Sequence, residues 1–125
     1  MEIEAISNPD MPRALGPYSQ AVRAGDLLFV AGQAGIDPVT GEVPDGGFEV
    51  EARQAFANLR QVLRAAGSDL DRVVKTTVFL ASAEAFPAMN ALYGEFFPSA
   101  PPVRSTPIVS LPRGLRISVE AIAAD

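Results

Sequence analysis

The sequence contains neither cysteine nor histidine among its 125 residues. Without cysteine, the chain has no disulfides, zinc-thiolate sites or thiol nucleophiles. Without histidine, it lacks the commonest general base and metal ligand, and neither a Ser-His nor a Cys-His pair can form. Any catalysis must therefore depend on carboxylates, Lys, Arg, Tyr, hydroxyls or the backbone.

Positive charge is scarce, since ten Lys and Arg residues stand against fifteen Asp and Glu, for a net charge of −5. This charge repels phosphate, and no cluster of basic residues offers an exception, so nucleic acid is a poor candidate partner. No apolar run approaches the roughly 18 residues of a membrane span, and the acidic start MEIEAISNPD does not resemble a signal peptide. We expect a cytoplasmic protein with no membrane partner.

The first half of the chain contains signals for a hairpin and a helix. Two short apolar runs within residues 20–31 flank Ala24-Gly25-Asp26, which predicts a β-hairpin. The GQAG stretch, residues 32–35, is expected to end the second strand, and a turn-rich loop follows. Apolar residues then recur at helical spacing from Glu49 to Ala66, which predicts a helix.

The second half repeats this alternation. The β-branched run VVKTTVFLA, residues 73–81, predicts a buried strand, and LRISVEAIAA, residues 115–124, predicts another. A second helix is expected between Ser82 and Pro98, with the apolar stripe Phe86, Met89, Tyr93 and Phe96. This order favours one α+β domain over residues 1–125, with both helices on one face of the sheet. The other face also looks apolar, and self-association is its expected cover.

Glu120 stands out because it lies between Val119 and Ala121 in the most apolar predicted strand. An ionised carboxylate is costly to bury unless it is paired or its pKa is raised. Glu120 is therefore a candidate general base or water-orienting group. The commoner explanation of such a pattern is an ion pair with Arg or Lys, or a partly exposed edge position.

Arg104 lies in the stretch PPVRSTP, directly after two prolines and one valine. Extended backbone beside a guanidinium suits a carboxylate clamp, because the donors of arginine can bind a carboxylate in bidentate fashion. An ordinary surface arginine is the commoner alternative.

Other polar residues are weaker candidates. Tyr18 could offer a phenol to a site, although a packed or interface tyrosine is commoner, and Asn90 could be a helix-surface amide. Ser105 and Thr106 lack a base to activate them, so hydrogen-bonding roles are expected. The GxxG at residues 32–35 is no phosphate-binding or dinucleotide motif, and the acidic residues are too scattered for a metal-binding loop. We expect no metal and no cofactor.

Several stretches together resemble the RidA family of reactive imine and enamine deaminases, also called the YjgF family. They are LGPYSQAV, VAGQAG, DPVTGEVP, ARQAFANLRQVLRAAG, VVKTTVFLA, MNALYGEFF, PPVRST and LRISVEAIA. The resemblance runs from about Gly16 to Ala123 in matching order and spacing, which is far more specific than any single motif.

The resemblance implies a chorismate-mutase-like α+β domain that assembles into a trimeric barrel, with sites in the clefts between subunits. It also implies a cofactor-free hydrolase that converts 2-iminopropanoate and 2-iminobutanoate to 2-oxo acids and ammonia. Such imines arise from enamines released by pyridoxal-phosphate-dependent dehydratases. The implied partners are this small molecule and two further copies of the chain.

The resemblance also implies roles for individual residues. Arg104 matches the arginine that holds the substrate carboxylate, and Glu120 matches the glutamate that positions the attacking water. Tyr18, Gly32 and Asn90 fall on further substrate-binding positions.

Three residues depart from the family pattern. Ala31 stands where many members have Ser, and Thr106 stands where many have Cys, although Thr106 is still expected to contact substrate. Pro107 replaces a residue with a backbone N–H. These departures leave open a trimer that binds 2-oxo acids or acts as a chaperone without catalysis, and a relative acting on aminoacrylate or amino-muconate. The ribonuclease activity sometimes attached to the family is disfavoured by the acidic charge and missing histidine.

Overall fold

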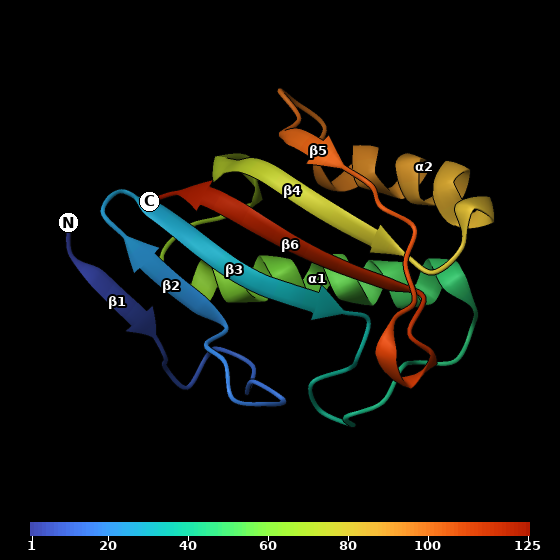
Figure 1. Ribbon diagram of the computed structural model, residues 1–125, viewed down its shortest axis with the longest axis horizontal. Helices are drawn as coiled ribbons and strands as arrows, with labels where there is room; N and C mark the ends of the chain where they lie inside the picture. Colours follow the sequence, from blue (N-terminus) through green and yellow to red (C-terminus); the bar gives the residue numbers. More distant parts are fainter.

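The computed structural model describes residues 1–125 and contains one six-stranded sheet and two α-helices (Figure 1). The strands are β1 (Ile3–Ile6), β2 (Ala21–Ala24), β3 (Leu27–Ala34), β4 (Val73–Leu80), β5 (Val103–Ser105) and β6 (Ile117–Ala124). The helices are α1 (Phe48–Ala65) and α2 (Phe86–Phe96), and the short 3-10 helices are η1 (Leu70–Arg72), η2 (Ala83–Ala85) and η3 (Pro112–Gly114). The sheet order is β1-β2-β3-β6-β4-β5, in which only β4 and β5 run parallel. The predicted α+β fold is confirmed.

The predicted hairpin is formed by β2 and β3, which pair antiparallel around Gly25, a turn residue with a φ of 61°. The prediction that residues 32–35 end the second strand is wrong, because β3 continues to Ala34. Its pairing with β6 shifts register between Val30 and Gln33, so a β-bulge absorbs the extra chain around Gly32. This irregular stretch faces the start of β6.

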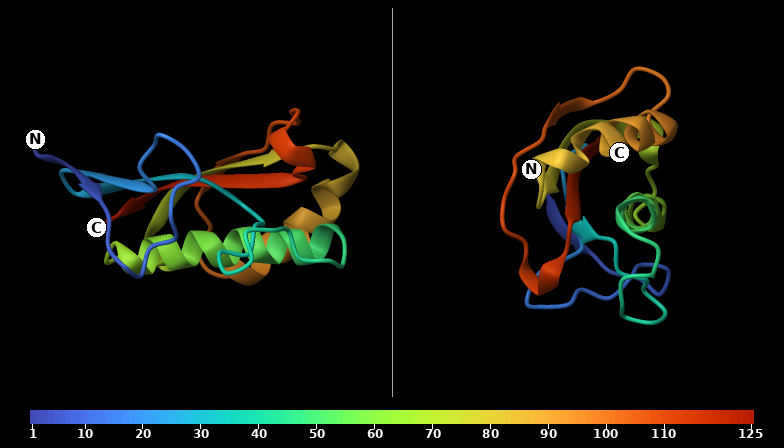
Figure 2. Two further views of the ribbon diagram at one scale, coloured as in Figure 1. Left: turned by 90° about the horizontal axis from the view of Figure 1, so that it is seen from below. Right: turned by 90° about the vertical axis from the view of Figure 1, so that its right-hand side faces the viewer.

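Both predicted helices are confirmed, and both lie on the same face of the sheet (Figure 2). Helix α1 agrees with its predicted bounds to within one residue, and Gly67 follows it with a φ of 87°. Ser82 begins the second helical segment as predicted, since its hydroxyl accepts the N–H of Glu84 at 3.2 Å. The core lies between the helices and the sheet, and its largest fully buried side chains include Phe56, Leu28, Leu59, Leu63, Leu80, Met89 and Ile117.

The sequence pattern predicts neither edge strand of the sheet. Strand β1 has four residues and β5 has three, which is too short for an alternating pattern to show. Arg104 lies in β5, so the extended backbone predicted for it is confirmed. Strand β6 begins at Ile117 instead of Leu115, because the chain is still turning through η3.

No α-helix covers the opposite face of the sheet, where only the loop before β2 and the segment from β5 through η3 lie at one side (Figure 2). This face presents Leu27 and Phe29 of β3 to solvent, with exposed fractions of 40% and 42%, whereas the alternate residues Leu28 and Val30 are buried. The predicted uncovered apolar face is therefore confirmed, and surfaces of this kind mark interaction sites. Neither helix is long and apolar enough to cross a membrane.

Candidate functional site

The guanidinium of Arg104 lies against helix α2. Its carbon Cζ is 4.7 Å from the centre of the Tyr93 ring and 5.6 Å from that of Phe86, and its Nη1 is 3.9 Å from Sδ of Met89. No carboxylate pairs with it. This half-buried arginine is therefore held by aromatic contacts and one weak N–H···S hydrogen bond, and no oxygen acceptor of the chain occupies its remaining donors, which are available for an anion.

The register of β4 and β5 explains this position. Arg104 pairs with Thr76 of β4, and both side chains point toward α2. The hydroxyls of Thr76 and Tyr93 lie 2.6 Å apart in the core. Burial raises the pKa of the Tyr93 phenol, and the Thr76 hydrogen bond and the positive charge of Arg104 oppose this effect. Tyr93 thus presents a neutral aromatic face to the cation.

Two more of the predicted site residues lie at this edge of the sheet. Asn90 is on α2, four residues after Phe86 and so on the same side of the helix, and its exposed amide makes no hydrogen bond within the chain. Thr106 follows β5 directly and is half-buried. The neighbouring Pro107 has no N–H, but its carbonyl accepts the N–H of Leu80 at 3.1 Å. Arg104, Asn90 and Thr106 thus belong to one edge.

Tyr18 and Gly32 line a separate cavity of about 560 Å³. Its walls come mainly from the loop before β2, the end of β3 with the loop after it, and η3, which lie along the lower side of the molecule in Figure 1. Arg104, Asn90 and Thr106 do not line it. One chain therefore does not bring Tyr18 and Gly32 together with Arg104.

A pair of buried glutamines holds the loop that carries Tyr18. Gln33 Nε2 donates to Gln20 Oε1 at 2.8 Å, and Gln20 Nε2 lies 3.4 Å from the carbonyl oxygens of Pro12 and Arg13. Both glutamines are less than a tenth exposed, and both line the cavity. The loop that carries Tyr18 is thus held by two buried side chains, one of which, Gln33, lies at the bulge in β3.

Sequence reasoning missed Ser118, which lines the same cavity as Tyr18 and Gly32. A Cβ atom placed on Gly32 would lie only 2.8 Å from Oγ of Ser118, so glycine at this position leaves room for the hydroxyl. The signal was present in the strand, since Ser118 precedes Glu120 by two residues and shares its face. Whether Ser118 or Glu120 lies opposite Gly32 depends on the bulge in β3, which the strand pattern does not reveal.

An ion pair between a buried carboxylate and a half-exposed arginine lies beside the far wall of the cavity. Glu51 of α1 is 1% exposed, and its carboxylate accepts both the Nε–H of Arg116 at 3.0 Å and the backbone N–H of Arg116 at 2.8 Å. A Cβ on Gly35 would overlap the backbone carbonyl of Glu51, so glycine permits this close approach of β3 to α1. The residue that follows the η3 and Leu115 wall of the cavity, Arg116, is therefore held in place by Glu51.

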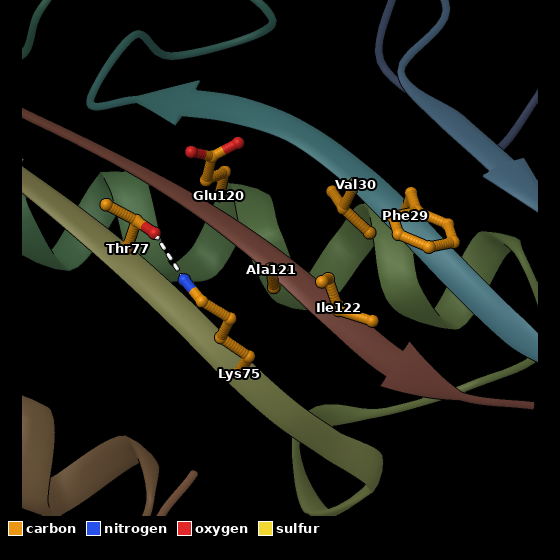
Figure 3. Close-up of a pocket in the computed structure, with 7 residues that line it drawn as sticks. All are labelled: Phe29, Val30, Lys75, Thr77, Glu120, Ala121 and Ile122. Carbon is orange, nitrogen blue, oxygen red and sulfur yellow. Dashed lines mark hydrogen bonds between the residues drawn. The ribbon is translucent and has the colours of Figure 1, made fainter. Parts of the chain in front are cut away.

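Glu120 lies in a third place, on the open face of the sheet (Figure 3). It lines a cavity of about 210 Å³ together with Phe29, Lys75 and Thr77. The Nζ of Lys75 donates to Oγ1 of Thr77 at 2.8 Å, and the exposed Glu120 has no ion-pair partner. Arg104 and Glu120 therefore project from opposite faces of the sheet within one chain.

A family model described as "Endoribonuclease L-PSP" matches residues 8–125. The chain belongs to this family. A mouse protein named "2-iminobutanoate/2-iminopropanoate deaminase" is 44% identical over 121 residues, which is 96% of this chain and 90% of the mouse protein. The crystal structure of RidA from the Antarctic bacterium Psychrobacter matches with a TM-score of 0.91 and 34% identity, over 98% of this chain and 99% of that one.

A second solved relative is TdcF from E. coli, crystallised with bound serine. It matches with a TM-score of 0.90 and 33% identity, over 98% of both chains. Sequence and structure thus place the chain in the same family, and the resemblance to RidA proteins predicted from its motifs is confirmed.

Proposed function

We propose that the protein is a hydrolytic deaminase that converts 2-imino acids, such as 2-iminobutanoate and 2-iminopropanoate, to 2-oxo acids and ammonia. The observation that carries this proposal is the free, half-buried guanidinium of Arg104, which is held by aromatic contacts and has no carboxylate of its own chain. The name of the mouse relative supports the same activity. The proposed location is the cytoplasm. A chain without cysteine suits this reducing compartment, because it needs no disulfide.

Hydrolysis of an imine requires only modest catalytic assistance from the protein. An iminium carbon is already electrophilic, so positioning and general acid-base assistance of about 10²- to 10⁴-fold are sufficient. Arg104 binds the substrate carboxylate through two parallel hydrogen bonds and fixes the C=N carbon. Water adds to this carbon, a proton moves from the added oxygen to the nitrogen, and the C–N bond of the carbinolamine breaks. A 2-oxo acid and an ammonium ion result, without a covalent intermediate.

The site requires more than one copy of the chain. Arg104 with Asn90 and Thr106 forms one part, and Tyr18 with Gly32 forms another in a separate cavity. The uncovered apolar face of the sheet supports contact with further copies. The assembly proposed is a homotrimer in which Arg104 of one copy closes the Tyr18 cavity of the next.

In this arrangement the attacking water lies near Ser118 and Gly32, because these residues share the cavity that Arg104 of the neighbouring copy would close. A serine hydroxyl can both donate to and accept from a bound water. The predicted water-positioning role of Glu120 instead requires Arg104 of a neighbour to reach the smaller cavity that Glu120 lines. Separate substitutions of Ser118 and Glu120 decide between these two geometries.

The proposal is tested by a coupled assay. A threonine dehydratase generates 2-iminobutanoate in place, and formation of 2-oxobutanoate is followed with and without the protein, beside serine-derived and bulkier imines. Faster 2-oxo acid formation that depends on protein concentration supports the proposal. Equal rates with and without protein, together with measurable binding of 2-oxobutanoate, would instead identify a trimer that binds 2-oxo acids without catalysis.

The family description includes the word endoribonuclease, so RNA cleavage needs a control. The net charge of −5 opposes binding of a phosphate backbone. Any RNA cleavage in a purified sample should survive Arg104→Ala and Ser118→Ala, which would identify it as a contaminant.

A further inference from the structure

The cavity that holds Tyr18 and Gly32 is much larger than a four-carbon imino acid requires. Its volume of about 560 Å³ falls within the range of roughly 300–1,000 Å³ that is typical of sites for drug-sized ligands. In a single chain this volume leaves space for a substrate larger than a four-carbon monoacid. The charges that line the cavity indicate the chemical class of such a substrate.

Two arginines line this cavity, Arg13 from the loop before β2 and Arg113 from η3. Neither forms an ion pair, although the chain contains fifteen acidic and only ten basic residues. Four other arginines are each paired with a carboxylate: Arg23, Arg53, Arg64 and Arg116. Two free guanidinium groups at one cavity of so acidic a chain favour an anionic ligand.

Asp37 is the one acidic residue that lines the cavity. Its carboxylate accepts the backbone N–H of Val39 at 2.8 Å, so it is engaged in its own turn. The other polar side chains of the lining, including Tyr18 and Ser118, are neutral hydrogen-bonding groups. The cavity thus combines positive charge with neutral donors.

The backbone at Arg113 supports a specific role for this residue. It adopts a φ of 60° and a ψ of 23°, in the left-handed region that residues other than glycine rarely occupy. Such conformations persist where the surroundings enforce them, and they cluster at functional sites. Three residues later the chain is held in place, because the buried carboxylate of Glu51 accepts both the backbone N–H and the Nε–H of Arg116.

We infer that the cavity accepts 2-imino acids that carry a second carboxylate, such as the imines of acidic amino acids, and that Arg13 and Arg113 bind the distal carboxylate. The inference rests on the proposed function, in which Arg104 of a neighbouring copy holds the carboxylate beside the imine. The reaction is unchanged: water adds to the C=N carbon, the C–N bond breaks, and nitrogen leaves as ammonium.

The test compares 2-iminosuccinate with 2-iminobutanoate, two four-carbon imines that differ in the second carboxylate. Amino-acid oxidases generate both in place, and capture of the remaining imine by semicarbazide reports its loss. In the wild type, kcat/KM should be higher for the diacid imine than for the monoacid imine. In Arg13→Gln/Arg113→Gln the ratio of these two values should fall at least about tenfold, mainly through KM, because the lost contacts are made in both ground and transition states.

The matched control is Arg72→Gln, which removes one positive charge from η1 but lines neither cavity. Its ratio should equal that of the wild type, whereas each single variant, Arg13→Gln and Arg113→Gln, should lower it. Arg113→Asn is a second variant at the left-handed position, since asparagine tolerates that backbone. A ratio unchanged in the folded double variant would overturn the inference.

Binding of products separates this inference from the proposed function. If the protein accelerates neither imine, the proposed function fails. Calorimetry then compares oxaloacetate with 2-oxobutanoate, the four-carbon products of the two imines: tighter binding of the diacid, lost in the double variant, supports the second carboxylate site. Equal affinities for the two products would overturn it.

Discussion

The guanidinium carbon of Arg104 lies 4.7 Å from the centre of the Tyr93 ring. A cation over an aromatic face gains roughly 0.5–2 kcal/mol, depending on its desolvation, and the contact leaves its N–H donors unused. Arg53 shows the contrast, because its donors are taken by Glu49 and Glu95 on the helix surface. Arg104 is therefore oriented without being satisfied, as a carboxylate clamp requires.

Replacement of Arg104 with alanine should lower kcat/KM for 2-iminobutanoate by the equivalent of about 2–5 kcal/mol, since a charge-assisted bidentate contact is lost. Arg104→Lys keeps the charge but not the planar pair of donors, so it should recover only part of this loss. Steady-state kinetics measure both. Arg53→Ala is the matched control on α1 and should retain the wild-type kcat/KM. Wild-type turnover by Arg104→Ala would disprove the clamp.

The position of Arg104 shows what the sequence can and cannot predict. Prolines on its N-terminal side predict the extended backbone, and that prediction is confirmed. Its contact with Tyr93 depends on the parallel register that pairs Arg104 with Thr76, and no local pattern specifies a pairing between segments so far apart. The regular elements with buried stripes, such as α1 and β4, were predictable because their periodicity records burial.

Glu120 and Ser118 show the same limit at the candidate site. Alternation along β6 predicts that both side chains share one face, which the structure bears out. It does not predict which of them meets Gly32, because the bulge in β3 breaks the regular register between these strands. The sequence thus identifies the strand and the face of the candidate site, while the separation into distinct cavities depends on contacts between distant segments.

Separate substitutions of Ser118 and Glu120 test which of the two cavities holds the attacking water. Ser118→Ala should lower kcat about tenfold or more, in the range expected for loss of an acid-base or positioning group, with a smaller effect on binding of 2-oxobutanoate. Glu120→Gln should lower kcat less, because its side chain lines the other cavity. Kinetics of both variants, with calorimetry of the product, make the comparison. The reverse order would show that Arg104 of a neighbour acts at the smaller cavity, with Glu120 in its predicted role.

The open sheet face should mediate assembly, and Phe29 is the side chain that tests it. Phe29→Lys introduces a charge where a 42% exposed aromatic ring lines the open face, so it should dissociate the proposed trimer. Activity should fall with dissociation because no single chain contains both parts of the site. Sedimentation equilibrium beside kinetics measures the two effects. Val39→Lys, in an exposed loop, is the control that should stay trimeric, and a monomeric yet fully active Phe29→Lys would contradict the shared site.

Tyr93 provides a prediction about pH. Burial raises the pKa of its phenol, while the Thr76 hydrogen bond and the charge of Arg104 oppose that effect. The folded protein therefore keeps this proton to higher pH than the unfolded chain does. As pH rises above about 10, where an unfolded tyrosine loses its proton, the unfolded state binds fewer protons and the free energy of unfolding falls.

In a Tyr93→Phe variant, the free energy of unfolding should not show the decrease above about pH 10 that is caused by this phenol. Near neutral pH it should be less stable than the wild type by about 1–3 kcal/mol, because the buried Thr76 hydroxyl loses its partner. Above about pH 10 the free energy of unfolding of the wild type decreases because of its buried phenol, whereas the variant has no phenol at this position. The difference in stability between the two proteins, the stability gap, should therefore narrow. Urea unfolding across this range, with tyrosinate absorbance of the folded proteins, measures the gap and the titration separately. A gap independent of pH would contradict the raised pKa, and with it the neutral aromatic face on which Arg104 rests.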